Sequence, residues 1–338
     1  MNLLITCKKS YENILIRETT LNNISVKSSG LSHVFASSSL KILKPEFCFA
    51  ELILKDSFEI SENSVNAWST KLSNLFTEYI KNKNINLSLP LIFTSSPKNK
   101  LNLRVKTIKK AWFMKISKKV SRVSKLLDEN LTLTNDFQGG FFVYFTDFNI
   151  AFVSFFALAQ NQQRMQTDPL APSRSYLKIE EAYYVLDCQP KANETVIDLG
   201  AAIGGWSYSA LKRGAKVIAI DNASLREPVK SHPNLTQLRE DALKFRPNKN
   251  KSADWLFCDI IENPEIILKL LSTWLINAWC RKFIVTLKIG HSDPIALIRK
   301  IKDEKTRITP YCSSLKIRHL YHNREEITLI GEHISFSQ

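Results

Sequence analysis

Glycine is scarce in this chain, and several patterns that assign a protein to a class at once are missing. There are nine glycines in 338 residues, and five of them lie between residues 200 and 290. Nothing approaches the roughly 18 uninterrupted apolar residues that a membrane span requires. The six cysteines form no CxxC pair, which favours reduced thiols over a disulfide framework or a zinc site. The first residues carry charges by position 8 and have no long apolar core, so we expect a cytoplasmic protein without a signal peptide.

Charge, by contrast, is abundant and strongly one-sided. The chain has 47 basic and 32 acidic residues, a formal net charge of +15, and a pI near 9.5. Residues 1–170 carry +9 and residues 171–338 carry +6. An excess of this size indicates a polyanionic partner, either nucleic acid or an anionic membrane surface, and both halves of the chain have the charge to touch it.

The first 165 residues predict a mixed α+β region. "NLLIT", "CFAELIL" and "LNLRVK" are interpreted as strands, residues 62–82 have helical spacing, and "GGFFVYF" and "IAFVSFFAL" indicate a strand pair. A second helix is predicted from 106 to 127, with Trp112 and Phe113 in the core. Nine basic residues and no acid lie between Arg104 and Lys125. By itself such a stretch is typical of a solvated helix face, and together with a nucleic-acid partner it favours contact with phosphates. "QTDPLAPSRS", residues 166–175, is the predicted domain linker.

Beyond the linker, strands and helices alternate, which predicts a doubly wound α/β domain. The tail "SSLKIRHLYHNREEITLIG" indicates two strands joined by a short turn, and hence an antiparallel edge. The strands of the alternating part are predicted at 195–199, 216–220, 235–238, 254–258 and 283–287.

A glycine-containing loop in this half indicates a cofactor site. Gly200, Gly204 and Gly205 follow a strand, and Asp221 stands 21 residues after Gly200. That spacing suits a ribose diol in both nicotinamide and S-adenosylmethionine sites. A dinucleotide fingerprint requires glycine at position 202, where this chain has Ala202. Together with the charge, this disfavours a nicotinamide-dependent oxidoreductase.

Two further acids follow strands, Asp241 in "LREDALKF" and Asp259 in "FCDI". Three acids at strand ends suit a cationic sulfonium cofactor better than a diphosphate, because the carboxylates attract the sulfonium and repel the diphosphate. The residues therefore favour S-adenosyl-L-methionine as the cofactor. The alternative from the residues alone is a Rossmann-like domain whose acids merely end strands.

The order of motifs resembles the RlmM family of 23S rRNA 2'-O-ribose methyltransferases, within the wider FtsJ-type group. The motifs are "PSRSYLKIEEAYYVL", "DLGAAIGGWSYSALKRGAKVIAIDN", "REDALKFRP", "DWLFCDIIENP", "AWCRKFIVTLKIG" and "YHNREEITL". The resemblance implies an α/β fold, with a Rossmann-like S-adenosylmethionine-dependent methyltransferase domain at 176–338. It further implies a preceding α+β region, ferredoxin-like over 1–60 and THUMP-like, hence RNA-binding, over 61–165.

FtsJ-type enzymes use a Lys-Asp-Lys-Glu tetrad, and the resemblance implies Lys178, Asp259, Lys288 and Glu326 for it. Glu325 is adjacent to Glu326 and is the alternative. Lys288 is assigned as the base and Lys178 as the contact to the 2'-oxygen or a neighbouring phosphate. A lysine acts as a base only if its pKa falls, and we expect burial and the second lysine to lower the pKa of Lys288. The candidate cofactor-binding residues are Ser175, Gly200, Ala202, Ile203, Gly204, Gly205, Asp221, Asp241 and Asp259.

One departure from the family concerns the glycine loop. The family usually has Cys-Pro before the paired glycines, where this chain has Ala202 and Ile203. Without the proline the loop is less preorganised, so we expect weaker cofactor affinity.

These features lead to two hypotheses. The first is an S-adenosylmethionine-dependent ribose 2'-O-methyltransferase whose partner is 23S rRNA or a large-subunit precursor. The resemblance implies a cytidine as its target. The second is an RNA-binding ribosome-assembly factor with a degenerate methyltransferase domain. Neither a metal, nor a membrane, nor a stable protein partner is expected in either case.

Overall fold

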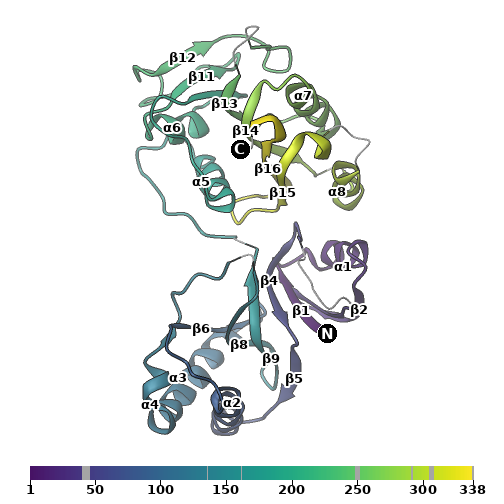
Figure 1. The fold of residues 1–338 in the computed structure, drawn as a ribbon, viewed down its shortest axis with the longest axis vertical. Helices are drawn as coiled ribbons and strands as arrows, with labels where there is room; N and C mark the ends of the chain where they lie inside the picture. Colours follow the sequence, from purple (N-terminus) through teal and green to yellow (C-terminus); the bar gives the residue numbers. More distant parts are fainter. Residues whose placement is uncertain are drawn as a thin grey trace. The chain divides into compact units, whose positions relative to one another are not determined.

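The computed structural model describes residues 1–39, 46–134, 136–160, 162–247, 252–290, 292–303 and 308–336. The chain divides into two compact units, Met1–Asn161 and Gln162–Gln338, shown in Figure 1. Each unit is described by itself.

The N-terminal unit is built on one sheet, in the order β2-β3-β1-β4-β9-β8-β6-β7, with β5 paired to β9. The pairing of β8 with β9 is antiparallel, which confirms the strand pair predicted from "GGFFVYF" and "IAFVSFFAL". The elements are β1 (Asn2–Cys7), α1 (Glu12–Leu21), β2 (Ser25–Gly30), β3 (His33–Ser37), β4 (Ala50–Lys55), β5 (Phe58–Ser61), α2 (Val65–Ile80), β6 (Leu89–Ser95), α3 (Leu101–Lys119), α4 (Ser121–Ser124), β7 (Leu127–Asp128), β8 (Gln138–Asp147) and β9 (Ile150–Ala159).

Two hydrophobic clusters hold this unit together. One gathers Leu15 of α1 with Leu3, Ile5 and other residues of β1, β3 and β4. The other packs α2 and α3 against β6, β8 and β9, with Trp68 and Trp112 fully buried. Buried aromatic side chains of this size remove a large apolar area from water, and they fix the two helices on the sheet. The ferredoxin-like and THUMP-like domains within this region stay predictions.

Three predictions for this region were wrong in detail. "LNLRVK" forms the first turns of α3 and not a strand. The predicted helix 106–127 ends at Lys119, followed by the short α4 and by β7. Phe113, expected in the core, is 41% exposed. The strand was predicted because Leu101, Leu103 and Val105 alternate with polar residues, as in a half-buried strand. In the helix only Leu101 and Val105 are buried.

The C-terminal unit is a seven-stranded sheet in the order β12-β11-β10-β13-β14-β16-β15. The strands from β12 to β14 are parallel, and β16 is antiparallel to both of its neighbours. The elements are α5 (Tyr176–Leu186), β10 (Thr195–Leu199), α6 (Gly205–Leu211), β11 (Lys216–Ile220), β12 (Leu235–Leu238), β13 (Ala253–Cys258), α7 (Pro264–Ile276), β14 (Cys280–Lys288), α8 (Pro294–Lys302), η2 (Thr309–Tyr311), β15 (Cys312–Arg318), β16 (Glu326–His333) and η3 (Ile334–Phe336).

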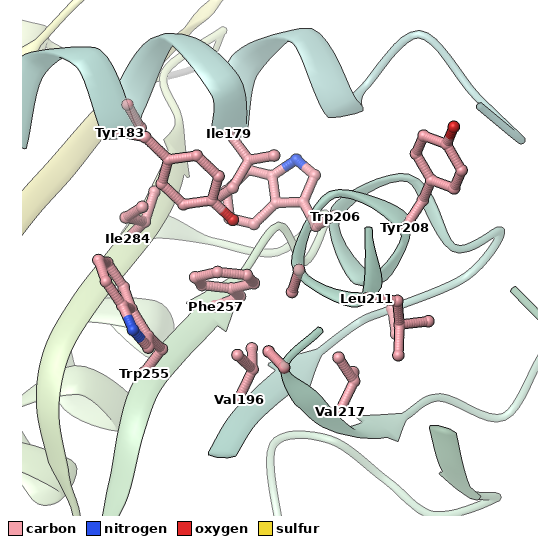
Figure 2. Packing of buried hydrophobic residues seen from close by; sticks show 14 of the residues in the cluster. Ile179, Tyr183, Val196, Trp206, Tyr208, Leu211, Val217, Trp255, Phe257 and Ile284 are labelled. Carbon is pink, nitrogen blue, oxygen red and sulfur yellow. The ribbon is translucent and has the colours of Figure 1, made fainter. Parts of the chain in front are cut away.

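The predicted doubly wound, Rossmann-like α/β fold is confirmed in this unit. Helices α5 and α6 cover one face of the sheet, and α7 and α8 lie on the other (Figure 1). Figure 2 shows the core under α5 and α6, where Trp206 stands edge-on to Phe257 and Tyr183 stands edge-on to Trp255. The central parallel strands β10, β13 and β14 are largely apolar and largely buried, which is why their positions could be predicted closely.

Candidate active site

The sheet order reverses at β10, and this point lies next to the glycine loop. β10 has β11 on one side and β13 on the other, so the chain crosses in opposite directions from this strand. Ligands of open α/β sheets bind beyond the carboxyl ends of the strands at such a switch point. The loop from Gly200 to Gly205 follows β10, and Asp259 follows β13. The fold therefore places both features at the edge where a ligand is expected.

Backbone geometry and Asp221 shape the glycine loop. Gly200 and Gly204 have φ values of 75° and 109°, in the left-handed region that residues with a Cβ atom rarely adopt. Asp221 Oδ2 accepts a hydrogen bond from the Ala202 backbone N–H at 2.9 Å, and Oδ1 accepts one from Ala223 N–H at 2.8 Å. Asp221 thus tethers the loop to the end of the neighbouring strand.

Gly205 permits a close approach between α6 and the start of α5. A Cβ atom at Gly205 would stand 2.3 Å from Ser175 Oγ, 2.4 Å from Ser173 Oγ and 3.1 Å from the Tyr176 nitrogen. The Trp206 indole N–H donates to the Ser175 carbonyl oxygen at 3.1 Å. The predicted cofactor residue Ser175 therefore lies beside the glycine loop, although about 30 residues separate them in the sequence.

Asp241 is held differently from the other candidate acids. It accepts from Leu243 N–H at 3.0 Å, and its second oxygen pairs with Lys244 at 3.3 Å. Both contacts are within its own loop after β12. No hydrogen bond in the described part of the chain joins Asp241 to the glycine loop, so its cofactor role rests on its position at the same sheet edge.

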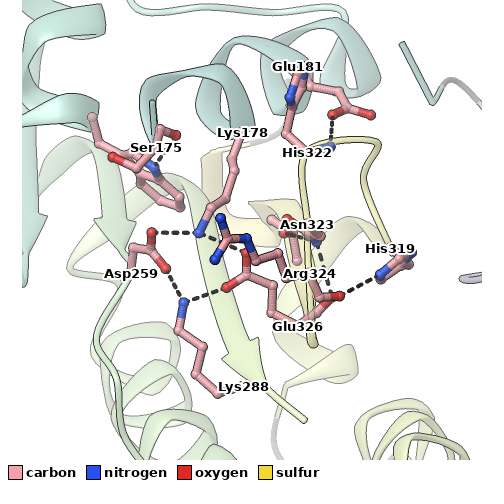
Figure 3. A network of polar contacts seen from close by, with 12 residues as sticks. Ser175, Lys178, Glu181, Asp259, Lys288, His319, His322, Asn323, Arg324 and Glu326 are labelled. Carbon is pink, nitrogen blue, oxygen red and sulfur yellow. Dashed lines mark hydrogen bonds and ion pairs between the residues drawn. The ribbon is translucent and has the colours of Figure 1, made fainter. Parts of the chain in front are cut away.

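Lys178, Asp259, Lys288 and Glu326 form one cluster, drawn in Figure 3. Lys178 Nζ lies 3.0 Å from Asp259 Oδ2 and 2.8 Å from Glu326 Oε1. Lys288 Nζ lies 2.6 Å from Asp259 Oδ1 and 2.5 Å from Glu326 Oε2. Each carboxylate thus bridges both lysines, and cations and anions alternate around a closed ring. The structure brings together all four residues that the sequence predicted for the tetrad.

Sheet register explains why these residues meet. Lys288 ends β14 and Glu326 begins β16, and the two are direct partners in the antiparallel pair. Asp259 follows β13, the other neighbour of β14, and Lys178 is contributed by α5. Glu326 is buried while Glu325 is exposed, because consecutive residues at a strand end face opposite ways. The structure therefore places Glu326, and not Glu325, in the cluster.

The pKa of Lys288 is shifted upward, and not downward as the sequence analysis expected. Burial by itself lowers the pKa of Lys288, but the Asp259 and Glu326 carboxylates outweigh it and hold that pKa above its usual value. Burial by itself raises the pKa of Glu326, yet the two lysines hold that pKa below its usual value. The predicted fall in the pKa of Lys288 was wrong for this state, since the lysine contacts two anions more closely than it senses the other cation.

Two buried acids near the site were missed by the sequence reasoning. Asp198 is the next-to-last residue of β10, and Ser207 Oγ donates to its Oδ2 at 2.6 Å. Burial raises the pKa of Asp198 to about 7, with Asp259 acting in the same direction and Ser207 opposing it. Glu181 lies on α5 with no exposed surface. An acid at the end of an apolar strand was a visible signal for Asp198, whereas Glu181 looked like a surface position on a helix.

The remaining sequence expectations concern metals, thiols and membranes. Among the described residues, no group of three or more His, Cys, Asp or Glu side chains is arranged to hold a metal ion. All six cysteines are free thiols. None of the helices in the described ranges is long and apolar enough to cross a bilayer.

Comparison with known proteins finds relatives of the part of the chain that carries the glycine loop. Residues 171–288 match the FtsJ-like methyltransferase family. A protein from Actinobacillus pleuropneumoniae serotype 3, named Ribosomal RNA large subunit methyltransferase M, is 38% identical over 177 residues, which cover 49% of this chain and 48% of that protein. A protein of the same name from Pseudoalteromonas atlantica is 35% identical over 208 residues, covering 55% of this chain and 57% of that protein.

Solved structures add little to this comparison. The 23S rRNA methyltransferase ErmE superposes with a TM-score of 0.35 at 11% identity, over 49% of this chain and 70% of that one. A similarity this low carries no functional argument.

The chain spans about half the length of the curated relatives that it matches. The match includes the glycine loop, Lys178, Asp259 and Lys288, and thus three of the four cluster residues. Residues 171–288 of the C-terminal unit are thus similar to the FtsJ-like methyltransferase family.

Proposed function

We propose that the chain transfers a methyl group from S-adenosyl-L-methionine to a ribose 2'-hydroxyl of large-subunit rRNA in the cytoplasm. The observation that carries this proposal is the closed Lys-Asp-Lys-Glu ring beside the glycine loop of an FtsJ-like domain. The relatives are named for large-subunit rRNA methylation, which supports 23S rRNA as the substrate. The proposed cytidine target rests on the family resemblance alone.

The residues present fit S-adenosylmethionine. The glycine loop lies at the switch point of the sheet, and Asp221 and Asp259 stand at the ends of β11 and β13. Carboxylates here attract a cation, and a half-buried Asp221 can accept hydrogen bonds from a ribose diol. When bound, the cofactor supplies a methyl group on a positively charged sulfur. The chain's task is to hold the acceptor hydroxyl in line with that methyl group and to exclude water.

The tetrad would handle the proton of the acceptor hydroxyl. Lys288 is proposed as the group that accepts this proton, and Lys178 as the cation that contacts the 2'-oxygen or a neighbouring phosphate. Asp259 and Glu326 orient both ammonium groups, because each carboxylate touches both. Lys288 must lose its own proton before it can accept another, and its raised pKa makes that loss the costly step.

The direct test is methyl transfer to unmodified rRNA. Purified protein, tritiated S-adenosylmethionine and 23S rRNA lacking the modification should give labelled rRNA, with the label on a ribose 2'-oxygen. Both naked rRNA and precursor particles should be offered. If neither substrate takes up label, the second hypothesis replaces the first: an RNA-binding assembly factor with a degenerate methyltransferase domain, as Ala202 and Ile203 in place of Cys-Pro suggested.

Cofactor binding should depend on Asp221. Asp221→Ala is expected to weaken S-adenosylmethionine binding by about 1.5–3 kcal/mol, the range for a hydrogen bond to a charged group. The variant loses both the proposed ribose contact and the tether to Ala202 N–H. Calorimetry measures the loss, and Glu265→Ala, an exposed acid on α7, is the matched control. An unchanged affinity, or tight binding of NAD in place of S-adenosylmethionine, would contradict the cofactor assignment.

The segment 104–125, which includes most of α3 and all of α4, is proposed to contact the RNA backbone within the THUMP-like region. Of its basic stretch, Lys109 and Lys115 already pair with Glu129 and with Asn66 and Thr70. Four exposed lysines of the stretch have no partner among the described residues, which leaves them for phosphates: Lys106, Lys110, Lys118 and Lys125.

Charge reversal of these four lysines should flatten the salt dependence of RNA binding. Each lost phosphate contact is expected to reduce the slope of log K against log salt by about one unit. Cofactor binding should stay unchanged. Lys9→Glu and Lys81→Glu, two exposed positions elsewhere in the same unit, serve as the control, and filter binding at several salt concentrations gives the slopes. An unaltered slope in the four-lysine variant would show that the segment 104–125 does not touch the backbone.

A further inference from the structure

Glu181 holds three backbone N–H groups although its side chain is completely buried. Its Oε1 accepts from Tyr321 N–H at 2.6 Å and from Gln163 N–H at 3.2 Å, and its Oε2 accepts from His322 N–H at 3.2 Å. Figure 3 shows the carboxylate above the loop that carries His322. A buried carboxylate that receives several backbone donors fixes their relative positions, because each lost bond would leave a polar group without water or partner.

The loop that Glu181 holds leads directly into the tetrad. It joins β15 to β16, and β16 begins at Glu326. Within the loop, Asn323 Nδ2 donates to the Glu326 carbonyl oxygen at 3.2 Å and to Thr328 Oγ1 at 3.0 Å. Hydrogen bonds thus connect the Glu181 carboxylate, through this loop, to the backbone of Glu326.

The other end of this connection is Lys178. Glu181 follows Lys178 by three residues on α5, so the two residues occupy neighbouring positions on the helix surface. Lys178 reaches Glu326 directly through its ammonium group. Two sets of contacts therefore connect Lys178 and Glu326. One is their own ion pair, and the other runs from Glu181 through the β15–β16 loop.

The same contacts include the segment by which the chain enters the C-terminal unit. Gln163 N–H donates to Glu181, and Met165 N–H donates to His322 Nε2 at 2.9 Å. Residues 163–165 thus rest on both α5 and the β15–β16 loop.

We propose that Glu181 is a positioning residue of the methyl transfer, which sets the β15–β16 loop so that Glu326 meets Lys178 and Lys288. It also ties residues 163–165 to that loop. This inference rests on the proposed function. Glu181 touches no reacting atom and acts only through the placement of Glu326.

Glu181→Gln tests the proposal with little change in size. The amide has one acceptor oxygen in place of two, and its NH₂ group would face at least one of the three N–H donors. The single-turnover rate at saturating RNA and cofactor is expected to fall at least tenfold, an order of magnitude set by losing one buried acceptor. The dissociation constants of RNA and cofactor should stay within about twofold of wild type, because no ligand contact is removed.

Glu180→Gln is the matched control. It makes the same chemical change one residue earlier on α5, where Glu180 pairs with Arg213 at 2.7 Å. Its rate should stay within about twofold of wild type, because its hydrogen-bond partners among the described residues are Arg213 and Ser209. Equal losses in both variants would show that any weakening of α5 suffices, and the proposal would be wrong.

A second measurement does not depend on methyl transfer. The ¹³Cε shift of Lys288 reports its titration, and Glu326 helps to hold that pKa above its usual value. Glu181→Gln should lower the pKa of Lys288 and should speed hydrogen exchange at the Tyr321 and His322 amides. If wild type transfers no methyl group, the proposed function fails while these two readouts still decide the placement of Glu326. An unchanged Lys288 titration, or a rate within twofold of wild type in an active enzyme, would overturn the inference.

Discussion

Lys288→Ala is expected to reduce the single-turnover rate of methyl transfer by about 10²–10⁴-fold, the usual share of general-base catalysis. Both RNA and cofactor should still bind, because Lys288 contacts Asp259 and Glu326 and lies outside the glycine loop. Rapid-quench assays at saturating substrates measure the rate, and calorimetry measures the two affinities. A loss confined to the cofactor affinity would assign Lys288 to binding instead of proton transfer.

The pH dependence of the methyl-transfer rate tests more directly whether Lys288 accepts the proton. The carboxylates hold the pKa of Lys288 above its usual value, so the neutral amine is a minor form at neutral pH. The wild-type rate should therefore rise with pH across the whole neutral and moderately alkaline range, and this rise should vanish in Lys288→Ala.

Lys288→Arg separates proton acceptance from positive charge. A guanidinium stays protonated and cannot accept the proton, so this variant should be almost as slow as Lys288→Ala. Near-normal turnover in Lys288→Arg would mean that the site needs only a cation, and the assignment of Lys288 as the base would be wrong.

Glu326→Ala is expected to destabilise the C-terminal unit by about 3–5 kcal/mol, the cost of breaking a buried ion pair by removing one partner. The Glu326 side chain is only 8% exposed and meets both lysines. Its loss leaves two ammonium groups close together with Asp259 as their one remaining tetrad carboxylate. Urea unfolding followed by tryptophan fluorescence measures the change.

Two variants control this result. Glu325→Ala changes the exposed neighbour and should alter stability by no more than about 0.5 kcal/mol. Glu326→Ala combined with Lys288→Met should recover part of the loss, because one uncompensated cation is removed together with its anion. A double variant as unstable as the sum of its parts would show that the two side chains do not interact in solution.

The contribution of Glu326 also depends on pH in a defined direction. Its folded pKa lies below the usual value, so its stabilising effect is present above the unfolded pKa and is lost as pH falls through the folded pKa. Acid titrations of wild type and Glu326→Ala should therefore converge at low pH.

Much of the C-terminal fold could be predicted because its central strands are recognisable from the local sequence alone. Buried parallel strands such as β10 and β11 are short apolar runs that end at an acid or a glycine. In the N-terminal unit the signal was ambiguous. Leu101, Leu103 and Val105 alternate as in a strand, and only the longer series continued by Ile108 and Trp112 shows the helix. Tertiary packing on β6 and β8 decided between the two patterns.

In the candidate site, the identity of the residues could be predicted from the sequence, but the contacts between them could not. The family resemblance was enough to select Lys178, Asp259, Lys288 and Glu326, because each stands in a motif that matches the family's. The sign of the Lys288 pKa shift was not accessible, because it depends on how closely the two carboxylates approach the amine. Glu181 was likewise beyond reach, since the backbone groups that it accepts from lie about 20 and 140 residues away in the sequence.

The position of β16 has a consequence for synthesis of the chain on the ribosome. β16 lies between β14 and β15, although it is translated after both. A nascent chain that stops before Glu326 has β15 without its neighbour in the described sheet, β14 with an open edge, and three of the four tetrad residues. The complete sheet therefore cannot form strand by strand in the order of translation. Glu326, which closes the ring, is the last tetrad residue to be made. On the proposed function, a partly made chain has its basic first half well before it has the complete tetrad.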